Sequence, residues 1–320
     1  MSFGAQEQYR VVLEGGQERA AEPSGALRAY GELPAVGDWV RVRPVGEFCL
    51  IEEVEARRTG FMRRAAGRVH ASQCVAANVD VCFLVCGLDG DLNLRRIERY
   101  LVLTWESGAR PVVVLNKEDV CSDLDAAIQA VRAIAPAADI VAISARRSVE
   151  PLRQWLGPGL TAALLGSSGA GKSTIANALT GLALATQKVR EHDSRGRHTT
   201  TASMLMPAGS AWLIDTPGMR ELGLLDSESS LDLGFPEIAT LAAGCRFGDC
   251  RHEQEPGCVV RAAVESGRIA AARWLSYTKL VREARHYARE SDPVAQRAEK
   301  QKWKTIHKRQ KRMYRDGERG

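Results

Sequence analysis

The sequence predicts a chain of three domains: a small β domain, an α/β domain with a largely parallel sheet, and a helical unit around a cysteine and histidine cluster. Three observations carry this prediction. Residues 1–70 contain short apolar segments, often alternating, that are separated by glycines and prolines. Residues 71–232 alternate continuous apolar runs with helical patterns. Residues 233–320 contain the cluster, a helical periodicity and a basic end.

Composition narrows the class of protein. With 320 residues, 45% of them apolar, the chain can build several cores. It has no apolar run of about 18 residues and no secretory signal at its start, so we expect a cytoplasmic protein without a membrane span. Eight cysteines in such a chain do not indicate disulfides. Five are scattered and are expected to be small apolar side chains: Cys49, Cys74, Cys82, Cys86 and Cys121.

The first domain reads as short strands. Residues 9–13, 25–30, 39–43 and 48–51 are the candidate strands, and their number and length favour a barrel of the OB type. A group of arginines follows. They suit a nucleic-acid-facing edge or a solvated linker equally well, and both interpretations stay open: Arg57, Arg58, Arg63, Arg64 and Arg68.

The second domain has the pattern of a parallel sheet covered on both faces. Its apolar runs are the predicted strands, and helical stretches at 95–105 and 124–135 lie between them. Ligands in such open sheets bind at the carboxyl ends of the strands. The predicted strands are 79–85, 111–115, 139–143, 161–165 and 211–214.

A phosphate-binding loop follows the strand at 161–165 and precedes a helical pattern at 174–179. Its glycines let backbone N–H groups turn toward phosphate oxygens, and the helix dipole favours the same negative charge. Lys172 is expected to reach the β- and γ-phosphates, and the Ser173 hydroxyl to bind Mg²⁺. The alternative is a glycine-rich turn without a ligand. The candidate residues are Gly166, Ser167, Ser168, Gly169, Ala170, Gly171, Lys172, Ser173 and Thr174.

The residues after the strand at 111–115 indicate which nucleotide base the protein binds. Asp119, in the pattern Asn116-Lys117-Glu118-Asp119, can accept from both N1–H and N2–H₂ of guanine, and adenine lacks those donors. Asn116 is expected to tie this loop to the phosphate loop, and the Lys117 stem to cover the base. A backbone N–H of Ser144-Ala145, after the strand at 139–143, can reach the guanine O6.

Two further loops suit a nucleotide switch. Asp215, at a strand end, is expected to hold Mg²⁺ through water, and the Gly218 N–H to bond the γ-phosphate. Among the threonines at 199–201 we select Thr200 for Mg²⁺, bound only while the γ-phosphate is present. Ordinary GTPases run phosphate loop first and N-K-x-D later. The opposite order here predicts a circularly permuted α/β P-loop GTPase domain, whose second switch, 215–222, leads directly into the C-terminal domain.

The last domain carries a metal-binding pattern and a basic tail. Three thiolates and one imidazole form a closed set of four ligands, which favours one structural zinc ion over free thiols: Cys245, Cys250, His252 and Cys258. Helical periodicity covers 259–289. From residue 297 onward ten Lys and Arg side chains stand against three acidic ones, in a chain of net charge +5. This tail, with Trp303 and Tyr314, suits RNA or is a solvated, frayed helix.

With these motifs in this order, the chain resembles the RsgA (YjeQ-type) family of circularly permuted GTPases that act on the small ribosomal subunit. The resemblance covers nearly the whole chain. It rests on Asn116 to Asp119, Gly166 to Ser173, residues 196–201, residues 215–218 and the four zinc ligands. It implies a GTP hydrolase that binds the 30S subunit and its 16S rRNA late in maturation, is stimulated by the subunit and leaves after hydrolysis. We expect a monomer that binds neither DNA nor membranes.

The resemblance also points to His198 as the group that orients water. Met219 occupies the position where many GTPases carry a glutamine, and its side chain cannot polarise water. The pKa of a histidine lies near neutrality, which suits a water contact or a proton role. The alternative is that His198 only contacts the ribosome. Two other functions remain to be separated by assay: an RNA-associated scaffold that uses GTP for stability, and a P-loop ATPase or small-molecule kinase.

Overall fold

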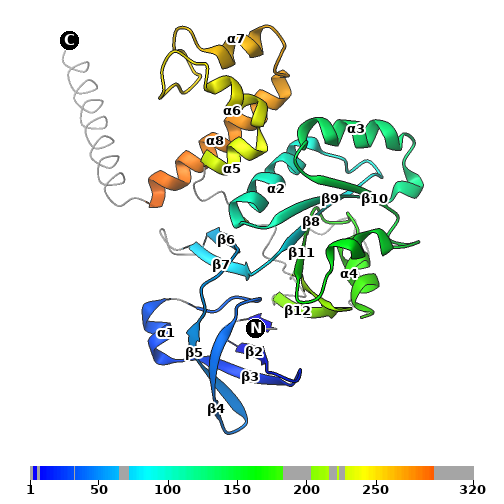
Figure 1. The fold of residues 1–320 in the computed structure, drawn as a ribbon, viewed down its shortest axis with the longest axis vertical. Coiled ribbons are helices and arrows are strands. Elements are labelled where there is room, and N and C mark those ends of the chain that lie inside the picture. The colour runs from blue at the N-terminus through cyan, green and yellow to red at the C-terminus, as the bar shows by residue number, and fades with distance from the viewer. Residues whose placement is uncertain are drawn as a thin grey trace, which may run out of the picture.

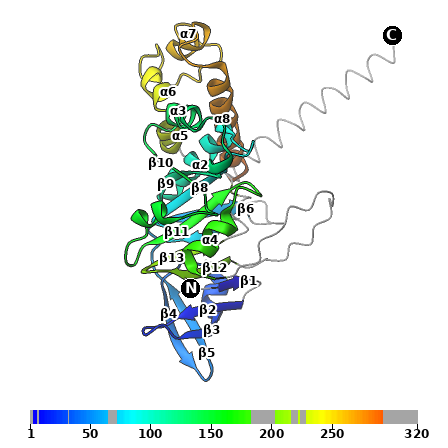
Figure 2. The ribbon, with the colours of Figure 1, turned by 90° about the vertical axis from the view of Figure 1, so that its right-hand side faces the viewer.

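The computed structural model describes residues 3–5, 8–31, 33–64, 72–182, 203–215, 222 and 228–291. The described elements follow one another along the long axis of the molecule. The N-terminal strands lie at one end, the α/β part in the middle and the C-terminal helices at the other end (Figures 1 and 2). Within these residues no helix combines the length and the apolarity needed to cross a membrane.

The middle part is built on parallel strands, as predicted. Neighbouring strands run in the order β10-β9-β8-β11-β13 and are parallel, and β12 (Ser203–Ala208) pairs antiparallel with β13. Every side chain of β8 is buried, which accounts for its continuous apolar sequence. The parallel strands are β8 (Val81–Gly87), β9 (Arg110–Asn116), β10 (Asp139–Ile143), β11 (Thr161–Gly166) and β13 (Ala211–Asp215).

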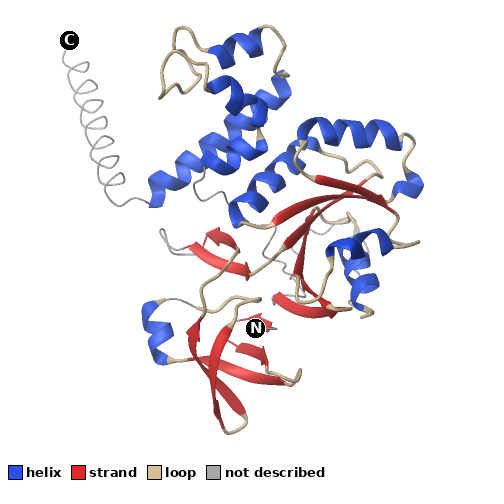
Figure 3. Ribbon diagram, viewed as in Figure 1, coloured by secondary structure: helices blue, strands red, loops and turns tan. Residues whose placement is uncertain are grey.

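Helices cover both faces of this sheet (Figure 3). One core joins one side of the strands to α2 (Leu94–Ser107) and α3 (Leu124–Ile134). The other joins the opposite side to α4 (Lys172–Thr180) and the 3-10 helix η2 (Glu150–Trp155). In β8, Cys82 and Leu84 face the first core and Phe83 and Val85 the second, as expected of alternating side chains on a strand.

The N-terminal strands form an extension of the same sheet. β3 (Glu18–Pro23) pairs with β2 (Gln8–Val12) and runs parallel to β5 (Phe48–Val54), which pairs with β4 (Val40–Val45). β1 (Phe3–Ala5) pairs with both β2 and β12 and so joins the extension to the central sheet. Tyr9, Val11, Cys49 and Ile51 belong to a separate small core.

One predicted strand is wrong. Residues 25–30 form helix α1 (Gly25–Tyr30) instead. The Ser24 hydroxyl accepts a hydrogen bond from the Leu27 N–H at 3.3 Å and caps the first turn. Gly31, with φ +74°, ends the helix in the left-handed conformation, where its N–H donates to Arg28 O. The two caps stabilise a helix in this segment more than its weak alternation favours a strand.

The arginine group after β5 has a partly structural role. The Nε and Nη2 atoms of Arg57 each donate to Asp38 at 2.8 Å, and the Asp38 side chain is fully buried. Asp38 in turn accepts from the Ala35 N–H at 2.7 Å. Arg63 lies on β6 (Gly60–Arg64), which pairs with β7 (Ser72–Ala77). Arg57 is therefore an exposed residue whose guanidinium is held by a buried carboxylate.

The C-terminal helices pack onto α2. They are α5 (Glu228–Gly234), α6 (Pro236–Ala242), α7 (Val259–Glu265) and α8 (Ala271–Ser291), so the predicted helical region 259–289 is two helices. Arg273 of α8 is buried and donates to Glu98 of α2 at 2.8 Å and to Glu237 of α6 at 2.6 Å. The neighbouring Arg99 of α2 pairs with Glu283 of α8. These charge-assisted contacts fix the helices on the α/β part.

Candidate functional site

The chemically distinctive loops meet at one edge of the central sheet. Because the five parallel strands point the same way, their carboxyl ends lie at the same edge, where open α/β sheets bind ligands. Four of these strands end at a predicted motif: β9 at Asn116, β10 before Ser144, β11 at Gly166 and β13 at Asp215. The topology thus gathers motifs that are separated by about 100 positions in the sequence.

The glycine loop between β11 and α4 has the backbone that a phosphate-binding loop requires. Gly169 and Gly171 adopt φ values of +81° and +103°, which other residues rarely tolerate. A Cβ on Gly171 would lie 2.1 Å from Asn116 Nδ2, and one on Gly166 would lie 2.3 Å from Val85 O. Helix α4 begins directly after Gly171, so its free N–H groups face the loop. A phosphate group suits this position.

The side chains of the loop are partly engaged with the protein itself. Lys172 Nζ donates to Gly166 O at 2.8 Å and also to Ser167 O. An ammonium held by the loop carbonyls is close to where the N–H groups gather, and it can exchange a carbonyl for a phosphate oxygen. Ser173 and Thr174 stand in the first turn of α4. A Ser173 hydroxyl at this place is a suitable Mg²⁺ ligand beside phosphate.

Asn116 joins three loops. Its Nδ2 donates to Ala170 O of the glycine loop at 2.8 Å, and its Oδ1 accepts from the Ala145 N–H at 2.9 Å. The tie between Asn116 and the glycine loop that the sequence predicted is present. Asn116 is 2% exposed, so both hydrogen bonds are shielded from water. Asn116 therefore ties the glycine loop to the loops that are expected to read the base.

Lys117 and Asp119 line the outer part of this edge. Lys117 has φ +67°, a strained conformation for a residue with a side chain, and its Nζ pairs with Asp89. Asp119 lies in the 3-10 helix η1 (Glu118–Val120) and is exposed. The Ser144 hydroxyl, followed by the backbone N–H of Asp119 and the charges of Arg147 and Arg146, lowers the pKa of Asp119 below its ordinary value. Among the described residues Ser144 Oγ meets no partner at normal hydrogen-bonding geometry, so its effect is that of a nearby dipole.

A pH prediction follows from this lowered pKa. Only the ionised Asp119 can accept from two guanine N–H groups, so binding is lost as the pH falls through the pKa of Asp119. The substitution Ser144→Ala removes the largest influence and raises that pKa toward its ordinary value. We expect the loss of fluorescent GDP analogue binding in acid to begin at a higher pH in Ser144→Ala than in the wild type. Ser122→Ala, at an exposed position, is the control. Coincident acid profiles for wild type and Ser144→Ala would contradict this role.

Of the residues predicted to contact Mg²⁺, the γ-phosphate and water in the two switch loops, the structure describes only Asp215. Asp215 ends β13 at the same edge as the glycine loop. His198, Thr200 and Gly218 lie outside the described residues. The expectation that Thr200 and Asp215 complete a Mg²⁺ site, and that His198 acts on water, therefore stays a prediction.

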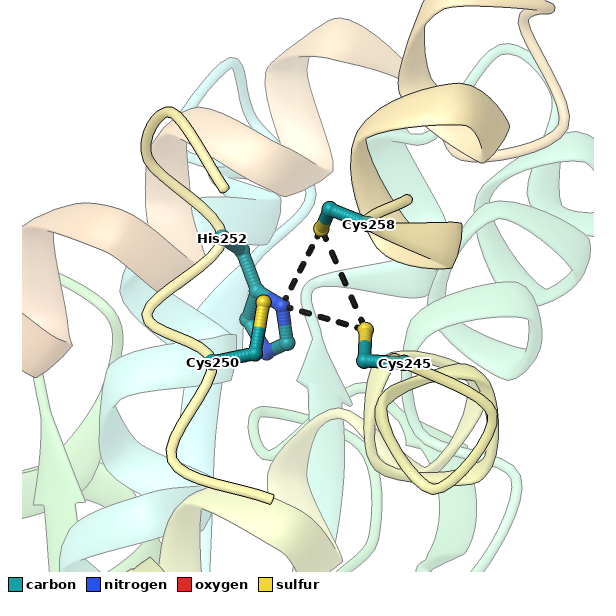
Figure 4. Close-up of side chains that lie close together, drawn as sticks. All are labelled: Cys245, Cys250, His252 and Cys258. Atoms are coloured by element: carbon teal, nitrogen blue, oxygen red, sulfur yellow. Dashed lines mark hydrogen bonds between the residues drawn. The ribbon is translucent and has the colours of Figure 1, made fainter. Parts of the chain in front are cut away.

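A separate cluster of metal-ligand side chains lies in the C-terminal part. One ligand atom from each of the four predicted residues falls within 4.8 Å of the others. His252 Nδ1 lies 3.4 Å from Cys258 Sγ and 3.6 Å from Cys245 Sγ, and the two sulfurs are 3.9 Å apart (Figure 4). Tetrahedral zinc with ordinary bond lengths separates two sulfurs by about 3.8 Å and nitrogen from sulfur by about 3.6 Å. The cluster is therefore compatible with one zinc ion bound through Nδ1 of His252.

The sequence analysis did not identify two acidic residues at the carboxyl edge of the central sheet. Asp89 pairs with Lys117, and Asp91 accepts a hydrogen bond from the Ser167 hydroxyl of the glycine loop. Both follow β8, the fifth parallel strand. The available signal was their position directly after a buried strand, the same signal that identified Asn116 and Asp215.

Comparisons with known proteins agree with this geometry. The family model described as RsgA GTPase matches residues 54–225. A protein of Opitutus terrae named small ribosomal subunit biogenesis GTPase RsgA is 50% identical over 94% of this chain and 87% of its own length. A protein of the same name from Leptospira interrogans is 44% identical over 96% of this chain and 88% of its own length.

Solved structures share the fold. The crystal structure of YjeQ from Thermotoga maritima matches with a TM-score of 0.64 and 27% identity, over 87% of this chain and 95% of that one. The structure of YloQ, a circularly permuted GTPase, also matches with a TM-score of 0.64, over 89% of this chain and 94% of its own. The identity to YloQ is 24%, so that likeness concerns the fold.

Proposed function

Because the chain belongs to the RsgA GTPase family, we propose that it binds GTP at the carboxyl edge of its central sheet and hydrolyses it during biogenesis of the small ribosomal subunit. One observation carries the nucleotide site. The buried Asn116 amide links the glycine loop at Ala170 to the Ala145 loop, at 2.8 Å and 2.9 Å. A phosphate loop held in fixed register with loops suited to guanine is the arrangement that a guanine nucleotide requires.

In this proposal each loop contacts one part of the nucleotide. Residues Gly166 to Thr174 hold the phosphates through backbone N–H groups and Lys172. Asp119 accepts from guanine, the Lys117 stem covers the base, and the Ser144-Ala145 backbone faces O6. Ser173, Thr200 and Asp215 would hold Mg²⁺, which would supply positive charge against the phosphates. The Gly218 N–H would contact the γ-phosphate.

We assign the orientation of the attacking water to His198, since Met219 offers no hydrogen-bonding group. A GTPase whose catalytic residue is placed only by its partner is slow alone. We therefore expect His198→Ala to lose most of the turnover that 30S subunits stimulate, while its turnover without subunits stays near the wild-type rate. Single-turnover hydrolysis of radiolabelled GTP checks this. Unchanged stimulation in His198→Ala would leave that histidine a ribosome-contacting residue at most.

The predicted second switch, residues 215–222, contacts a side chain that also pairs with a C-terminal helix. Leu222 is buried, and its carbonyl accepts from Arg99 Nη2 at 3.0 Å. The same guanidinium pairs with Glu283 of α8. Nucleotide-dependent movement of residues 215–222 would therefore act on a group that also holds α8. This contact supports the view that the nucleotide state changes how the C-terminal domain is presented.

The proposed partner is the 30S subunit with its 16S rRNA, bound late in maturation by a monomer in the cytoplasm and released after hydrolysis. The relatives' names and the basic tail from residue 297 support it.

We propose that the chain has three domains, with boundaries at 70/71 and 232/233. The first domain is proposed to be an OB-type barrel, supported by the parallel pairing of β3 with β5 and by α1 between β3 and β4. One structural zinc ion is proposed for the last.

Co-sedimentation tests the partner. The full-length chain is mixed with purified 30S or 50S subunits in the presence of a non-hydrolysable GTP analogue, GDP or no nucleotide, and then pelleted. We expect binding to 30S with the GTP analogue, weaker binding with GDP and none to 50S. Binding that ignores the nucleotide would favour an RNA-associated scaffold, and equal binding to 50S would reject the assignment of the partner.

A further inference from the structure

Residues 87–91, which begin at the last residue of β8, lie between the two main motifs that we propose to bind nucleotide. In the sheet, β8 lies between β9 and β11, with β9 leading to Asn116-Lys117 and β11 leading to the glycine loop. Its carboxyl end is therefore flanked by both motifs. We refer to residues 87–91 as the β8 loop.

The β8 loop contacts both neighbours. On one side the Leu88 N–H donates to Asn116 O at 2.9 Å, and the Asp89 carboxylate pairs with Lys117 Nζ. On the other side the Asp91 carboxylate accepts from the Ser167 hydroxyl of the glycine loop. The two acidic side chains of one short loop thus each engage a residue of a different nucleotide-binding motif.

The loop itself is held in place by neighbouring groups. Asp91 Oδ1 pairs with Arg96 Nη2 at 2.6 Å, and the same nitrogen donates to Asp91 O. At its start, a Cβ on Gly87 would lie 2.5 Å from Asp89 Oδ1 and 3.5 Å from Lys117 Nζ. A side chain at position 87 would displace the Asp89 carboxylate from the place where it reaches the lysine. This geometry limits where the Asp89 carboxylate can lie.

We propose that Asp89 is a positioning residue for guanine nucleotides: it fixes the Lys117 ammonium so that the lysine stem lies ready to cover the base. The inference rests on the proposed nucleotide site. A lysine side chain has four flexible carbons and a strongly hydrated ammonium, so it loses entropy when it orders over a base. An anchored ammonium has lost part of that freedom before the nucleotide binds, and this raises affinity through pre-organisation.

Asp89 also determines where the positive charge lies. Without the carboxylate, the Lys117 ammonium is free to turn toward solvent or toward the phosphates, and the stem leaves the base. The side chains of Lys117 and Asp89 are 30% and 41% exposed, so the pair is partly screened by water. The expected effect on affinity is therefore moderate, about fivefold to tenfold, which corresponds to about 1 kcal/mol.

The test compares variants of the full-length chain by titration with fluorescent GDP and by steady-state GTP hydrolysis. We expect Asp89→Asn to raise the GDP Kd and the GTP KM by about fivefold to tenfold with kcat little changed. Asp89→Glu, which keeps the carboxylate, should recover most of the affinity. In a Lys117→Ala background, Asp89→Asn should add little, because the group that it positions is absent. Asp125→Asn, an exposed position on α3, is the matched control and should bind like the wild type.

Two results would overturn the inference. One is a GDP Kd for Asp89→Asn equal to that for Asp125→Asn. The other is an equal loss of GDP affinity on Asp89→Asn in the wild type and in the Lys117→Ala background. Melting temperatures of all variants separate loss of fold from loss of positioning. A different measurement would show that the proposed nucleotide site itself is wrong. In that case the wild type would show no preference for GDP over ADP, whereas a failure of this inference alone leaves the wild-type preference intact.

Discussion

Replacing Asp119 with alanine is expected to lower the affinity for GDP and GTP by at least about a hundredfold, because guanine N1–H and N2–H₂ then lose the charged acceptor to which both donate. Asp119 is an exposed residue of η1 at the outer part of the sheet edge, and like an ordinary aspartate it is ionised at neutral pH. An ionised carboxylate can accept two hydrogen bonds from guanine at once. Since the side chain is exposed, its removal should not disturb the fold.

Competition titrations of GDP and ADP against a fluorescent guanine nucleotide measure this effect. The wild type should prefer GDP strongly, and Asp119→Ala should bind GDP and ADP with similar weak affinity. Glu118→Gln changes the adjacent acidic residue of the same short helix and should keep the preference. A strong preference for GDP in Asp119→Ala would mean that another group reads the base. Equal binding of GDP and ADP by the wild type would favour the ATPase or kinase alternative.

Loss of one zinc ligand is the second large effect. Cys258 belongs to the ligand cluster and also caps the N-terminus of α7, where its sulfur accepts from the Arg261 N–H at 3.4 Å. The loop from Cys245 to Cys258 contains little regular structure, so the metal is expected to supply much of its stability. A structural zinc site can contribute about 10 kcal/mol to folding. We expect Cys258→Ser to lose zinc and to unfold this loop, together with the α7 packing that depends on it.

Elemental analysis of zinc, together with limited proteolysis, measures this outcome. The wild type should carry one zinc per chain and resist cleavage between residues 245 and 258, and Cys258→Ser should carry none and be cleaved there. Cys121→Ser is the control, because Cys121 is a free cysteine outside the cluster. A metal-free wild type that resists cleavage would show that the four side chains are ordered without zinc.

The sequence predicted the part of the fold that depends on local patterns. Continuous apolar runs identified the parallel strands, and the polar residues after them identified the edge where loops meet. The contact between Asn116 and the glycine loop could be predicted from the pattern Asn116-Lys117-Glu118-Asp119. The predicted strand 25–30 is wrong because Ser24 and Gly31 cap the two ends of a helix there.

Other features depend on contacts between distant residues. Arg57 pairs with the buried Asp38, 19 positions away, and nothing in the local pattern of either residue indicates the other. Asp89 reaches Lys117 over 28 positions because their strands are adjacent in the sheet. Arg273 reaches Glu98 over 175 positions, between the C-terminal helices and α2. Such pairs are set by the topology, so they became visible only when the strand and helix order was known.

The most direct test of the central claim is GTP hydrolysis by the full-length chain with and without purified 30S subunits, with ATP and 50S subunits in parallel. We predict slow turnover of GTP alone, a large stimulation by 30S, no such stimulation by 50S and no comparable use of ATP. Equal GTP turnover with and without 30S would contradict the proposed ribosome-dependent activity, and equal turnover of ATP would contradict the guanine site.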